Sequence, residues 1–212
     1  MGAAKTAFVL AGGGSLGAVQ VGMLKALCRA RITPDLVVGA SVGAINAAYY
    51  AAAPDESGVA QLERIWLDLR RSDVFPLSTS DTLLCLLGRR DFLSQPDPLR
   101  ALIASRLPYR YLDDAALPCH VVATDALDGR EVILSTGDAA DALLASAAIP
   151  AVFPSVVIGG RPLMDGGIAS NTPISAAIEL GATRVLILPT GTPCALQEPP
   201  HGALAIALHA IN

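Results

Sequence analysis

Along the first quarter of the chain, apolar and polar positions follow the rhythm of a parallel α/β fold. An apolar run at residues 7–11 ends at three glycines, which predicts a buried strand. Residues 18–30 then carry apolar side chains at helical spacing. A second apolar run at residues 35–39 leads into a helix over residues 44–53, which ends at Pro54. Because strand, turn and helix occur twice in succession, we expect parallel strands covered by helices.

The rhythm breaks between residues 55 and 117 and resumes after them. Helical patterns at residues 62–69 and 97–106 flank a less regular piece at residues 75–94. Further strands, a hairpin, a helix and a last strand are then predicted at residues 119–123, 131–134, 156–164, 173–180 and 184–188. The succession of elements places the chain in the α/β class.

High hydropathy raises the question of membrane spans. Apolar residues make up 52% of the chain and charged residues 16%, against about 25% charged in a typical domain, and the mean hydropathy is +0.50. The uncharged stretches at residues 6–24, 36–53 and 142–160 are about as long as a membrane span, but glycines or prolines interrupt each one. We therefore expect no transmembrane helix and interpret these stretches as buried α/β segments of a folded core.

Charge and cysteine content narrow the class of partner. The net charge of −4 argues against nucleic acid, which needs a basic face. The first residues lack the layout of a signal peptide, so we expect a cytoplasmic protein, with peripheral membrane contact as an open option. The spacing of Cys and His fits no metal site, so we expect no metal, no cofactor and free thiols at Cys28, Cys85, Cys119 and Cys194.

A glycine-rich turn follows the first predicted strand and opens the first helix. Gly12, Gly14 and Gly17 have the spacing G-x-G-x-x-G, with Gly13 between the first two. A dinucleotide site needs an acidic residue at the end of the second strand, whereas Asp35 stands at its start. Backbone N–H groups at a helix N-terminus suit an anion or an oxyanion hole instead, and the same glycines also suit a plain tight turn.

A second glycine-marked turn lies between the second strand and its helix. Gly39, Ser41 and Gly43 form G-x-S-x-G in a strand–turn–helix context, which is the requirement of a nucleophile elbow. The sharp turn exposes the serine hydroxyl at a helix N-terminus, where developing negative charge is favoured. The alternative is an ordinary N-cap serine between small residues.

A nucleophilic serine needs a base, and two kinds of base are open. His120 lies inside a predicted strand, whereas His201 and His209 lie on a predicted terminal helix. A Ser-Asp-His triad can be assembled from Ser41, Asp165 and His201. Against this arrangement, several strands precede the elbow in an α/β-hydrolase, and here the elbow follows the second.

The other candidate base is the aspartate alone. Asp165 ends a hairpin strand and is followed by Gly166 and Gly167. Asp-Gly is also ordinary turn chemistry, as at Asp128 and Gly129. Glycine loop, serine elbow and late Asp-Gly-Gly are nevertheless much more specific together than any one of them.

These motifs resemble those of the patatin-like phospholipase family, the serine–aspartate lipid acyl hydrolases. The resemblance is carried by four segments: GGGSLGAVQVGML, GASVGAINAAYYA, SAAIPAVFP and MDGGIASNTPISAAIELGA. It covers most of the chain, and residues 55–117 match only vaguely, as a variable, lid-like insert would. It implies a single three-layer domain over residues 1–212, with a central, mostly parallel sheet between helices.

The resemblance also implies a catalytic dyad in place of a triad. Ser41 would be the nucleophile and Asp165 its base, and the N–H groups of the glycine loop and of Val42 would form the oxyanion hole. The family often has Arg or Lys in that loop where this chain has Leu16, which removes a side-chain charge but leaves the backbone donors. A carboxylate with the ordinary pKa of about 3.9 is a poor base toward an alcohol, so we expect burial to raise the pKa of Asp165.

We therefore predict a serine acyl hydrolase that cleaves carboxylic esters of phospholipids or other acyl lipids through an acyl-serine intermediate. Two alternatives stay open: a Ser-His-Asp esterase or acyltransferase, and a phosphate- or nucleotide-binding module that uses the glycine loop. Within the insert, an apolar cluster is consistent with an acyl-chain channel and equally with core packing. Its members are Leu83, Leu84, Leu86, Leu87, Phe92 and Leu93.

The last residues of the chain form an apolar helical pattern without a capping residue. Leu204, Ile206, Leu208 and Ile211 leave little polar surface on this segment. We expect either that a longer protein continues beyond residue 212 or that the segment packs against a partner subunit. The sequence does not indicate the oligomeric state.

Overall fold

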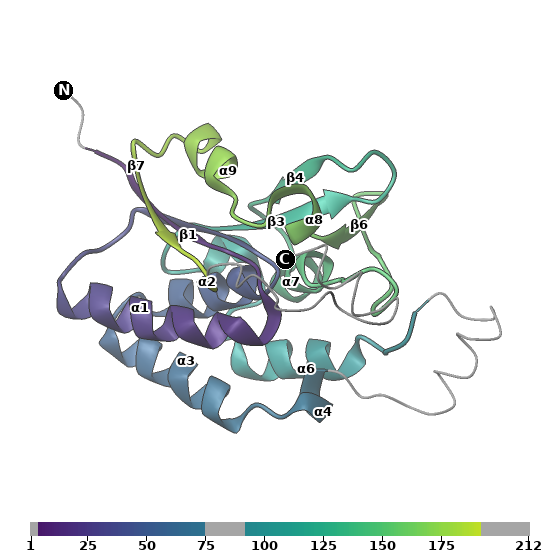
Figure 1. The fold of residues 1–212 in the computed structure, drawn as a ribbon, viewed down its shortest axis with the longest axis horizontal. Helices are drawn as coiled ribbons and strands as arrows, with labels where there is room; N and C mark the ends of the chain where they lie inside the picture. The colour runs from purple at the N-terminus through teal and green to yellow at the C-terminus, as the bar shows by residue number, and fades with distance from the viewer. Residues whose placement is uncertain (1–3, 75–91, 192–212) are drawn as a thin grey trace, which may run out of the picture.

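A mixed β-sheet forms the centre of the molecule, and helices cover both of its faces (Figure 1). The computed structural model describes residues 4–74 and 92–191. Within them the strand order is β5-β6-β3-β2-β1-β7, and β4 pairs with β3 beside this path. The strands are β1 Thr6–Leu10, β2 Leu36–Ala40, β3 Cys119–Asp125, β4 Glu131–Leu134, β5 Val156–Ile158, β6 Arg161–Asp165 and β7 Arg184–Leu188. The predicted α/β fold, with its sheet between helices, is confirmed.

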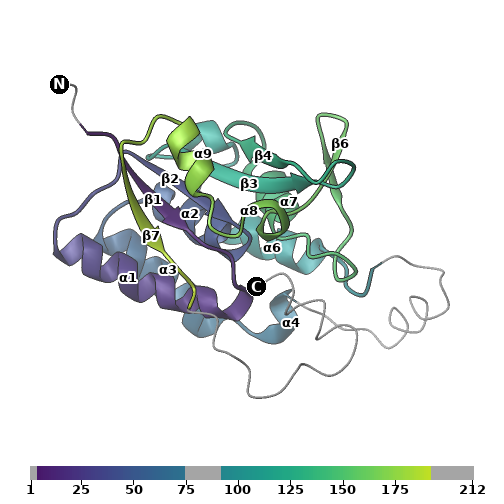
Figure 2. The same cartoon turned by 45° about the horizontal axis from the view of Figure 1, so that its top comes forward.

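The strand register brings two distant segments to one place. β7, β1, β2 and β3 pair in parallel, whereas β4 and β6 pair antiparallel with β3, and β5 with β6. Ala40 of β2 lies opposite Val122 of β3, and Asp165 of β6 lies opposite Ala123, the next residue of β3. The end of β2 and the end of β6 therefore meet, although 124 residues separate Ser41 from Asp165. Figure 2 shows the helices α7 and α8 lying against β3 in this part of the molecule.

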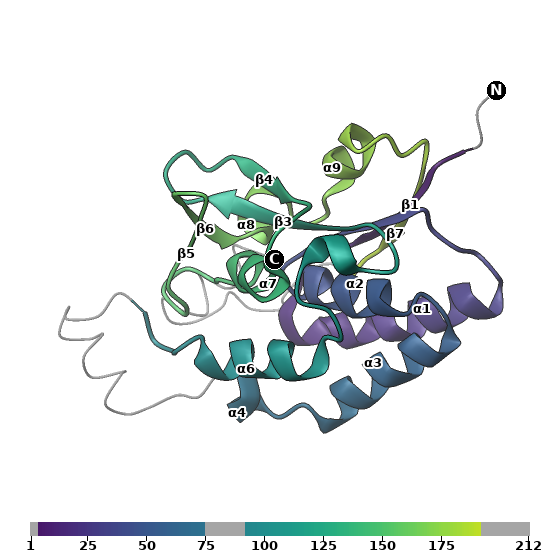
Figure 3. The ribbon, with the colours of Figure 1, turned by 180° about the vertical axis from the view of Figure 1, so that it is seen from behind.

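Side chains of the central strands alternate between two apolar cores. In β1, Phe8 and Leu10 belong to the larger core, whereas Ala7 and Val9 belong to the smaller one. Helices α1, α2, α3, α6 and α7 complete the larger core, and α9 covers the smaller one on the other face, as the view from behind shows (Figure 3). The helices are η1 Gly14–Gly17, α1 Ala18–Arg29, α2 Val42–Ala52, α3 Glu56–Asp68, α4 Arg71–Val74, α6 Asp97–Arg106, η2 Leu112–Asp114, α7 Ala139–Ser146, α8 Gly167–Ser170 and α9 Ile174–Glu179.

Two of the helices, α3 and α7, show how the structure departs from the sequence-based expectation. The helix predicted at residues 62–69 begins earlier, at Glu56, because the Asp55 carboxylate accepts two N–H bonds of the first turn at 2.8 and 3.0 Å. The sequence pattern predicts no helix where α7 lies. Six of its eight residues are buried, and a helix that is buried nearly all round shows little amphipathic periodicity.

The described residues also bear on the membrane, metal and cysteine predictions. Among them, no helix is long and apolar enough to cross a membrane, and no three side chains of His, Cys, Asp or Glu are grouped to hold a metal ion. Cys28 and Cys119 are free thiols. Several predictions fall on residues outside the described ranges: those for Cys85 and Cys194, for the leucines at 83–87, and for the apolar segment at 204–211.

Candidate active site

Ser41 occupies the sharp turn between β2 and α2. Its backbone angles are φ 54° and ψ −127°, a conformation that a residue with a side chain adopts only when its surroundings enforce it. Two glycines permit the turn. A Cβ atom on Gly39 would collide with the backbone of Gly43, and one on Gly43 would collide with the carbonyl group of Leu10. The turn has the geometry of a nucleophile elbow.

The Ser41 hydroxyl donates a hydrogen bond to Asp165. The Ser41 Oγ–Asp165 Oδ2 distance is 2.7 Å, and the other carboxylate oxygen accepts the N–H of Gly167 at 2.8 Å. Asp165 is 2% exposed, and this burial raises its pKa to about 6, although the bonds from Ser41 and Gly167 act in the opposite direction. A carboxyl group with this pKa is ionised at neutral pH and is a stronger base than an ordinary aspartate.

The backbone around Asp165 fixes the position of the carboxylate. The Asp165 N–H donates to the carbonyl of Ala148 at 2.9 Å, and its carbonyl accepts the Thr124 hydroxyl at 2.8 Å. The chain then turns at Gly166, where a Cβ atom would collide with the carbonyl of Val122. The Asp-Gly-Gly motif therefore serves close packing against β3.

Ser146, the last residue of α7, connects the elbow to the centre of the sheet. Its side chain is fully buried, accepts the Ser41 N–H at 2.8 Å and donates to the Val122 carbonyl at 2.6 Å. Its own carbonyl accepts the N–H of Gly166, the residue after the candidate base, at 3.1 Å. Ser146 thus bonds both to Ser41 and to the residue that follows Asp165. The sequence motifs did not identify Ser146. Its place at the start of SAAIPAVFP is the signal that could have pointed to it.

The glycine loop lies beside Ser41, and its three glycines have different environments. A Cβ atom on Gly12 would lie 3.2 Å from that of Ser41. The Gly12 N–H donates to the Asn171 carbonyl at 2.9 Å, so this predicted oxyanion donor is already engaged. Gly13 and Gly14 have positive φ angles of 152° and 55°. Their N–H groups, like that of Val42, have no acceptor among the described residues.

Thr190 holds the loop from the side of β7. Thr190 is 8% exposed, and its hydroxyl donates a hydrogen bond to the Gly12 carbonyl at 2.6 Å. Its side chain fills the space in which a side chain on Gly13 would stand. Both the conformation and the close contact therefore require glycine at position 13.

A buried polar network ties the far end of the loop to the helices. Asn46 of α2 donates to the Gly17 carbonyl at 3.0 Å and to the Gln20 side chain at 2.8 Å, and it accepts the Trp66 indole N–H at 2.9 Å. Gln20 in turn donates to the Ala11 carbonyl at 2.8 Å. Gly17 itself has no room for a side chain, because Val42 and Trp66 lie too close. Gln20, Asn46 and Trp66 were not predicted as parts of the site.

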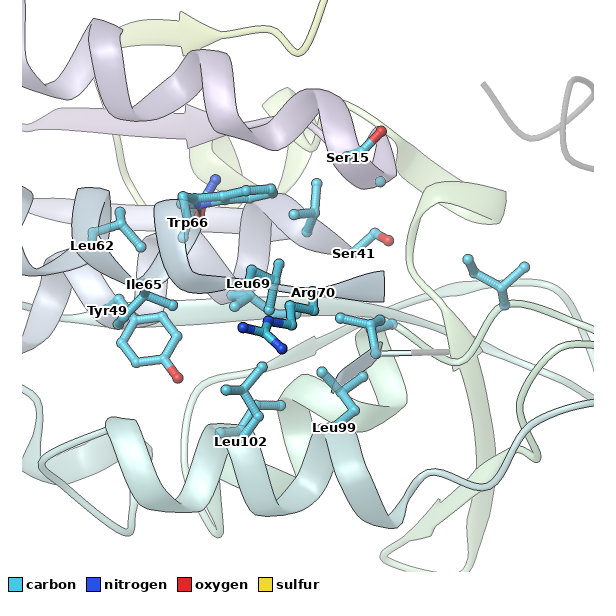
Figure 4. Close-up of a pocket in the computed structure, with 18 of the residues that line it drawn as sticks. Ser15, Ser41, Tyr49, Leu62, Ile65, Trp66, Leu69, Arg70, Leu99 and Leu102 are labelled. Atoms are coloured by element: carbon cyan, nitrogen blue, oxygen red, sulfur yellow. Dashed lines mark hydrogen bonds between the residues drawn. The ribbon is translucent and has the colours of Figure 1, made fainter. Parts of the chain in front are cut away.

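A cavity of about 520 Å³ opens beside Ser41, a volume typical of small-molecule sites. Figure 4 shows Ser41 and Ser15 at one end and Tyr49 and Leu62 toward the other. Helices α2, α3 and α6 provide most of its wall, and most of the side chains are apolar. The polar ones are Ser15, Ser41, Asn46, Tyr49 and Arg70. An elongated apolar space next to the serine suits an acyl chain better than a nucleotide.

His120, the histidine within the described residues, takes no part in the site. His120 lies opposite Val38 in the β2–β3 register, where its Nδ1 is 2.8 Å from the Ser135 hydroxyl, and burial lowers its pKa. His201 and His209 lie outside the described residues. Within the described ranges, the group that contacts the Ser41 hydroxyl is the carboxylate of Asp165.

Elbow, buried carboxylate and glycine loop lie together on a mixed α/β sheet, an arrangement that a serine hydrolase would need, and comparison with known proteins identifies the family. The family model described as patatin-like phospholipase matches residues 8–178. This match covers most of the chain. The chain therefore belongs to the patatin-like phospholipase family.

Individual relatives agree with this assignment. The chain is 28% identical over 188 residues to patatin-like phospholipase domain-containing protein 7 of Rattus norvegicus, which covers 88% of this chain and 14% of the rat protein. It is 26% identical over 187 residues to the neuropathy target esterase sws of Drosophila melanogaster, over 87% of this chain and 13% of that protein. The chain thus spans about one seventh of these relatives.

The fold is also similar to a crystal structure of VipD from Legionella pneumophila. The TM-score is 0.59 at 17% sequence identity, and the match covers 88% of this chain and 49% of that one. At this identity the likeness concerns the fold alone.

Proposed function

We propose that this chain is a lipid acyl hydrolase that cleaves carboxylic esters of phospholipids or other acyl lipids with a Ser41–Asp165 dyad. The observation that carries the proposal is the 2.7 Å hydrogen bond between a serine in a strained elbow and a carboxylate that is 2% exposed. A serine becomes a nucleophile when an adjacent base accepts its proton, and the carboxylate that accepts the Ser41 hydrogen bond supports this role for Asp165.

In the first half of the reaction, Ser41 Oγ attacks the ester carbonyl carbon while its proton passes to Asp165 Oδ2. The carbonyl oxygen becomes an oxyanion, for which the N–H groups of Gly13, Gly14 and Val42 are the proposed donors. Gly12 is left out of this set, because its N–H is bonded to Asn171. The ester C–O bond then breaks, and the leaving alcohol takes the proton from Asp165.

In the second half, a water molecule replaces the alcohol. Asp165 accepts a proton from the water as it attacks the acyl-serine carbonyl, and the same donors stabilise the second oxyanion. Ser41 Oγ leaves with the proton, which restores the starting hydrogen bond. Each step uses groups of this chain and water, so the atoms balance without a further reactant.

The cavity supports an acyl lipid as the substrate. Its wall beside Ser41 includes Val42, Ile45, Ile149 and Phe153, which would surround a hydrocarbon chain whose ester lies at the serine. Burying apolar surface favours binding by about 25 cal/mol per Å². The family name points to phospholipids as substrates. Simpler acyl esters are included in the proposal because the apolar wall would bury their acyl chain in the same way.

Covalent labelling tests the nucleophile. A fluorophosphonate probe should label the wild-type chain at Ser41 and leave Ser41→Ala unlabelled. Ser105→Ala is the matched control, because Ser105 is an exposed serine of α6 whose hydroxyl bonds within its own helix, and it should label like the wild type. Probe incorporation located at any serine other than Ser41 would contradict the proposal and favour a binding module that uses the glycine loop.

Hydrolysis assays test the base and the substrate class. We expect release of fatty acid from a panel of phospholipids, lysophospholipids, monoacylglycerols and p-nitrophenyl esters. His201→Ala should keep this activity and Asp165→Asn should lose it. The reverse pattern would establish a Ser-His-Asp triad, and a clear preference for short soluble esters would argue against the lipid substrate.

A further inference from the structure

Two buried side-chain amides hold the two ends of the glycine loop. Gln20 of α1 and Asn46 of α2 are both fully buried. Gln20 donates to the carbonyl of Ala11, the residue before the loop, at 2.8 Å, and Asn46 donates to the carbonyl of Gly17 at the other end, at 3.0 Å. Asn46 also donates to the Gln20 side-chain oxygen at 2.8 Å. One bonded pair of side chains therefore anchors the loop that carries the proposed oxyanion donors.

The Trp66 indole completes this chain of hydrogen bonds. Gln20 gives its second N–H to the Leu188 carbonyl at 2.9 Å, and Trp66 Nε1 donates to Asn46 Oδ1 at 2.9 Å. Backbone carbonyls only accept and an indole N–H only donates, so each amide has a single orientation that pairs all of its polar atoms. Without the indole N–H, a buried oxygen of Asn46 would lose its partner, beside the bond that holds Gly17.

Trp66 lies between this network and the cavity. It is a half-buried residue of α3 and lines the cavity. Figure 4 shows its ring in the wall, with Leu62 on one side and Ser41 on the other. The Cζ2 edge of the ring lies against the loop, because a Cβ atom on Gly17 would stand 3.0 Å from it. The same side chain therefore contacts both the space for an acyl chain and the end of the loop.

A hydrocarbon chain in the cavity would pack on the indole ring. Single contacts between carbon atoms are weak, but a chain that lies along a ring makes many of them. Such packing favours the ring position in which the N–H reaches Asn46. Through Asn46 and Gln20, it would also favour the bonded arrangement of the loop.

We propose that Trp66 is a positioning residue for the oxyanion donors, and that an acyl chain packed on its ring acts through it to hold the glycine loop in place. The inference rests on the proposed function, in which Gly13 and Gly14 donate to the oxyanion. Binding energy from a part of the substrate that does not react is then used at the reacting centre, so it raises kcat. A chain too short to reach Trp66 leaves this contribution unused.

The direct test compares kcat for two esters with the same leaving group. In the wild type, kcat for p-nitrophenyl decanoate should exceed kcat for p-nitrophenyl butanoate by at least about fivefold, the lower end of the usual coupling between two sites. Trp66→Phe keeps an aromatic ring and removes the N–H, so this kcat ratio should fall to about 1. A rise in KM with the kcat ratio unchanged would show that Trp66 only packs against the chain, and would overturn the inference.

Gln20→Met acts on the loop from outside the cavity. Gln20 is not among the residues that line the described cavity, and methionine keeps its length without its hydrogen bonds. The variant should lower kcat for the decanoyl ester to about the level of Trp66→Phe, and the double variant should lose no more than the larger single loss. Losses that multiply would mean that the two residues act independently, against the inference. If Gln20→Met does not fold, the kcat ratio of Trp66→Phe decides.

Tyr109→Phe is the matched control. The Tyr109 hydroxyl donates to the Ala48 carbonyl of α2 at 2.9 Å, so this variant also removes one hydrogen bond from an aromatic side chain to that helix. Tyr109 is not among the residues that line the described cavity, and it has no bond to the loop or its two amides. The variant should keep the wild-type kcat ratio. An equal fall of the ratio in Tyr109→Phe would assign the effect to general loosening of α2 and overturn the role of Trp66.

Binding without turnover separates this inference from the proposed function. Trp66 is the single tryptophan of the sequence, so tryptophan emission of the inactive Ser41→Ala chain reports on this ring. Decanol should shift the emission more than butanol, and it should also shift the NMR signals of the Gly13 and Gly14 N–H groups. Adding Trp66→Phe should remove the NMR response.

The possible outcomes distinguish the two proposals. If decanol gives the Trp66-dependent response but the wild type hydrolyses no ester, the proposed function fails and the coupling between cavity and loop stands. If esters are hydrolysed but the Gly13 and Gly14 signals respond equally to both alcohols, the coupling fails and the proposed function stands. A response that Trp66→Phe keeps would likewise overturn the inference.

Discussion

The two ends of the cavity are built by different forces. At the strand end, Ser41, Ser146 and Asp165 are held by hydrogen bonds of 2.6–2.8 Å to one another and to the backbone of β3 and its neighbours. At the helical end, α3 and α6 contribute side chains such as Leu62 and Ile103, which are held by apolar packing.

This difference divides the roles of the two regions. Hydrogen bonds are directional, so each bonded group at the strand end has one position and a lost partner leaves a buried polar atom unpaired. Apolar packing depends on shape and volume and tolerates exchanges of similar size. We therefore expect substitutions at the strand end to remove activity and substitutions at the helical end to change which ester is preferred.

Asp165→Asn should show the largest loss at the strand end. The amide cannot accept the Ser41 proton, so kcat/KM should fall by about 10⁴, the scale seen when a member of a catalytic unit is removed. Steady-state hydrolysis of a lipid ester measures the effect. Retention of more than a tenth of the activity would remove Asp165 from the mechanism.

The same variant should be more stable than the wild type at pH 7. The pKa of Asp165 is raised from 3.8 to about 6, so the folded chain binds this proton more tightly, and the free energy of unfolding falls as pH rises between these values. The neutral amide of the variant carries no such penalty, and the gain should be about 1–3 kcal/mol at pH 7 and vanish below about pH 4. Urea unfolding at both pH values checks the sign.

Ser146→Ala should lower kcat by about 10- to 100-fold with little change in KM. It leaves the Ser41 N–H and the Val122 carbonyl without their buried partner, which displaces the elbow without touching the acyl cavity. Ser94→Ala is the matched control, because Ser94 is 1% exposed and its hydroxyl has no partner among the described residues. An equal loss of kcat in the two variants would show that Ser146 acts only as a buried residue of the core and does not position Ser41.

The pH dependence of kcat/KM should follow the ionisation of the base. Because Asp165 must be ionised to accept the proton and its pKa is about 6, activity should fall toward tenfold per pH unit below that value. A histidine base would titrate in the same region, so the profile is repeated with His201→Ala. The acidic limb should persist in that variant.

The smallest effect is expected at the helical end. Leu102→Phe adds volume to the cavity wall and should lower the kcat/KM ratio of long-chain to short-chain esters by about fourfold for each methylene excluded, at about 0.8 kcal/mol each. Leu67→Phe on α3 is the control, because Leu67 is 79% exposed and does not line the cavity. A change in this ratio with Leu67→Phe would mean that the wall has been assigned wrongly.

Local chemistry explains how much could be predicted from sequence. The turn at Ser41 needs glycines at fixed offsets, so the elbow is visible in five consecutive residues, and the strand rhythm around it predicts the sheet. Gly13, whose φ is positive, lies in the glycine-rich turn that the sequence predicts. These features depend on neighbours along the chain, and the structure places them where the pattern predicts.

Contacts between distant segments explain what was missed. Ser146 bonds to Ser41 across 105 residues, and nothing in its immediate sequence indicates that its hydroxyl faces the elbow. The Gly12 N–H is engaged by Asn171, which lies near the other end of the described chain. The sequence motifs indicate the candidate reacting groups, whereas the residues that support these groups can be recognised only once the fold is known.

Because β3 pairs with both β2 and β6, we expect any activity of the site to appear late in folding. Strand β2 and strand β6 must both be paired, opposite Val122 and Ala123, before Ser41 and Asp165 come within 2.7 Å. A slip of β6 by one residue would turn Asp165 to the opposite face of the sheet. Closing a contact over 124 residues is slow compared with forming local helices, so a refolding chain should regain helical content well before it regains a nucleophile.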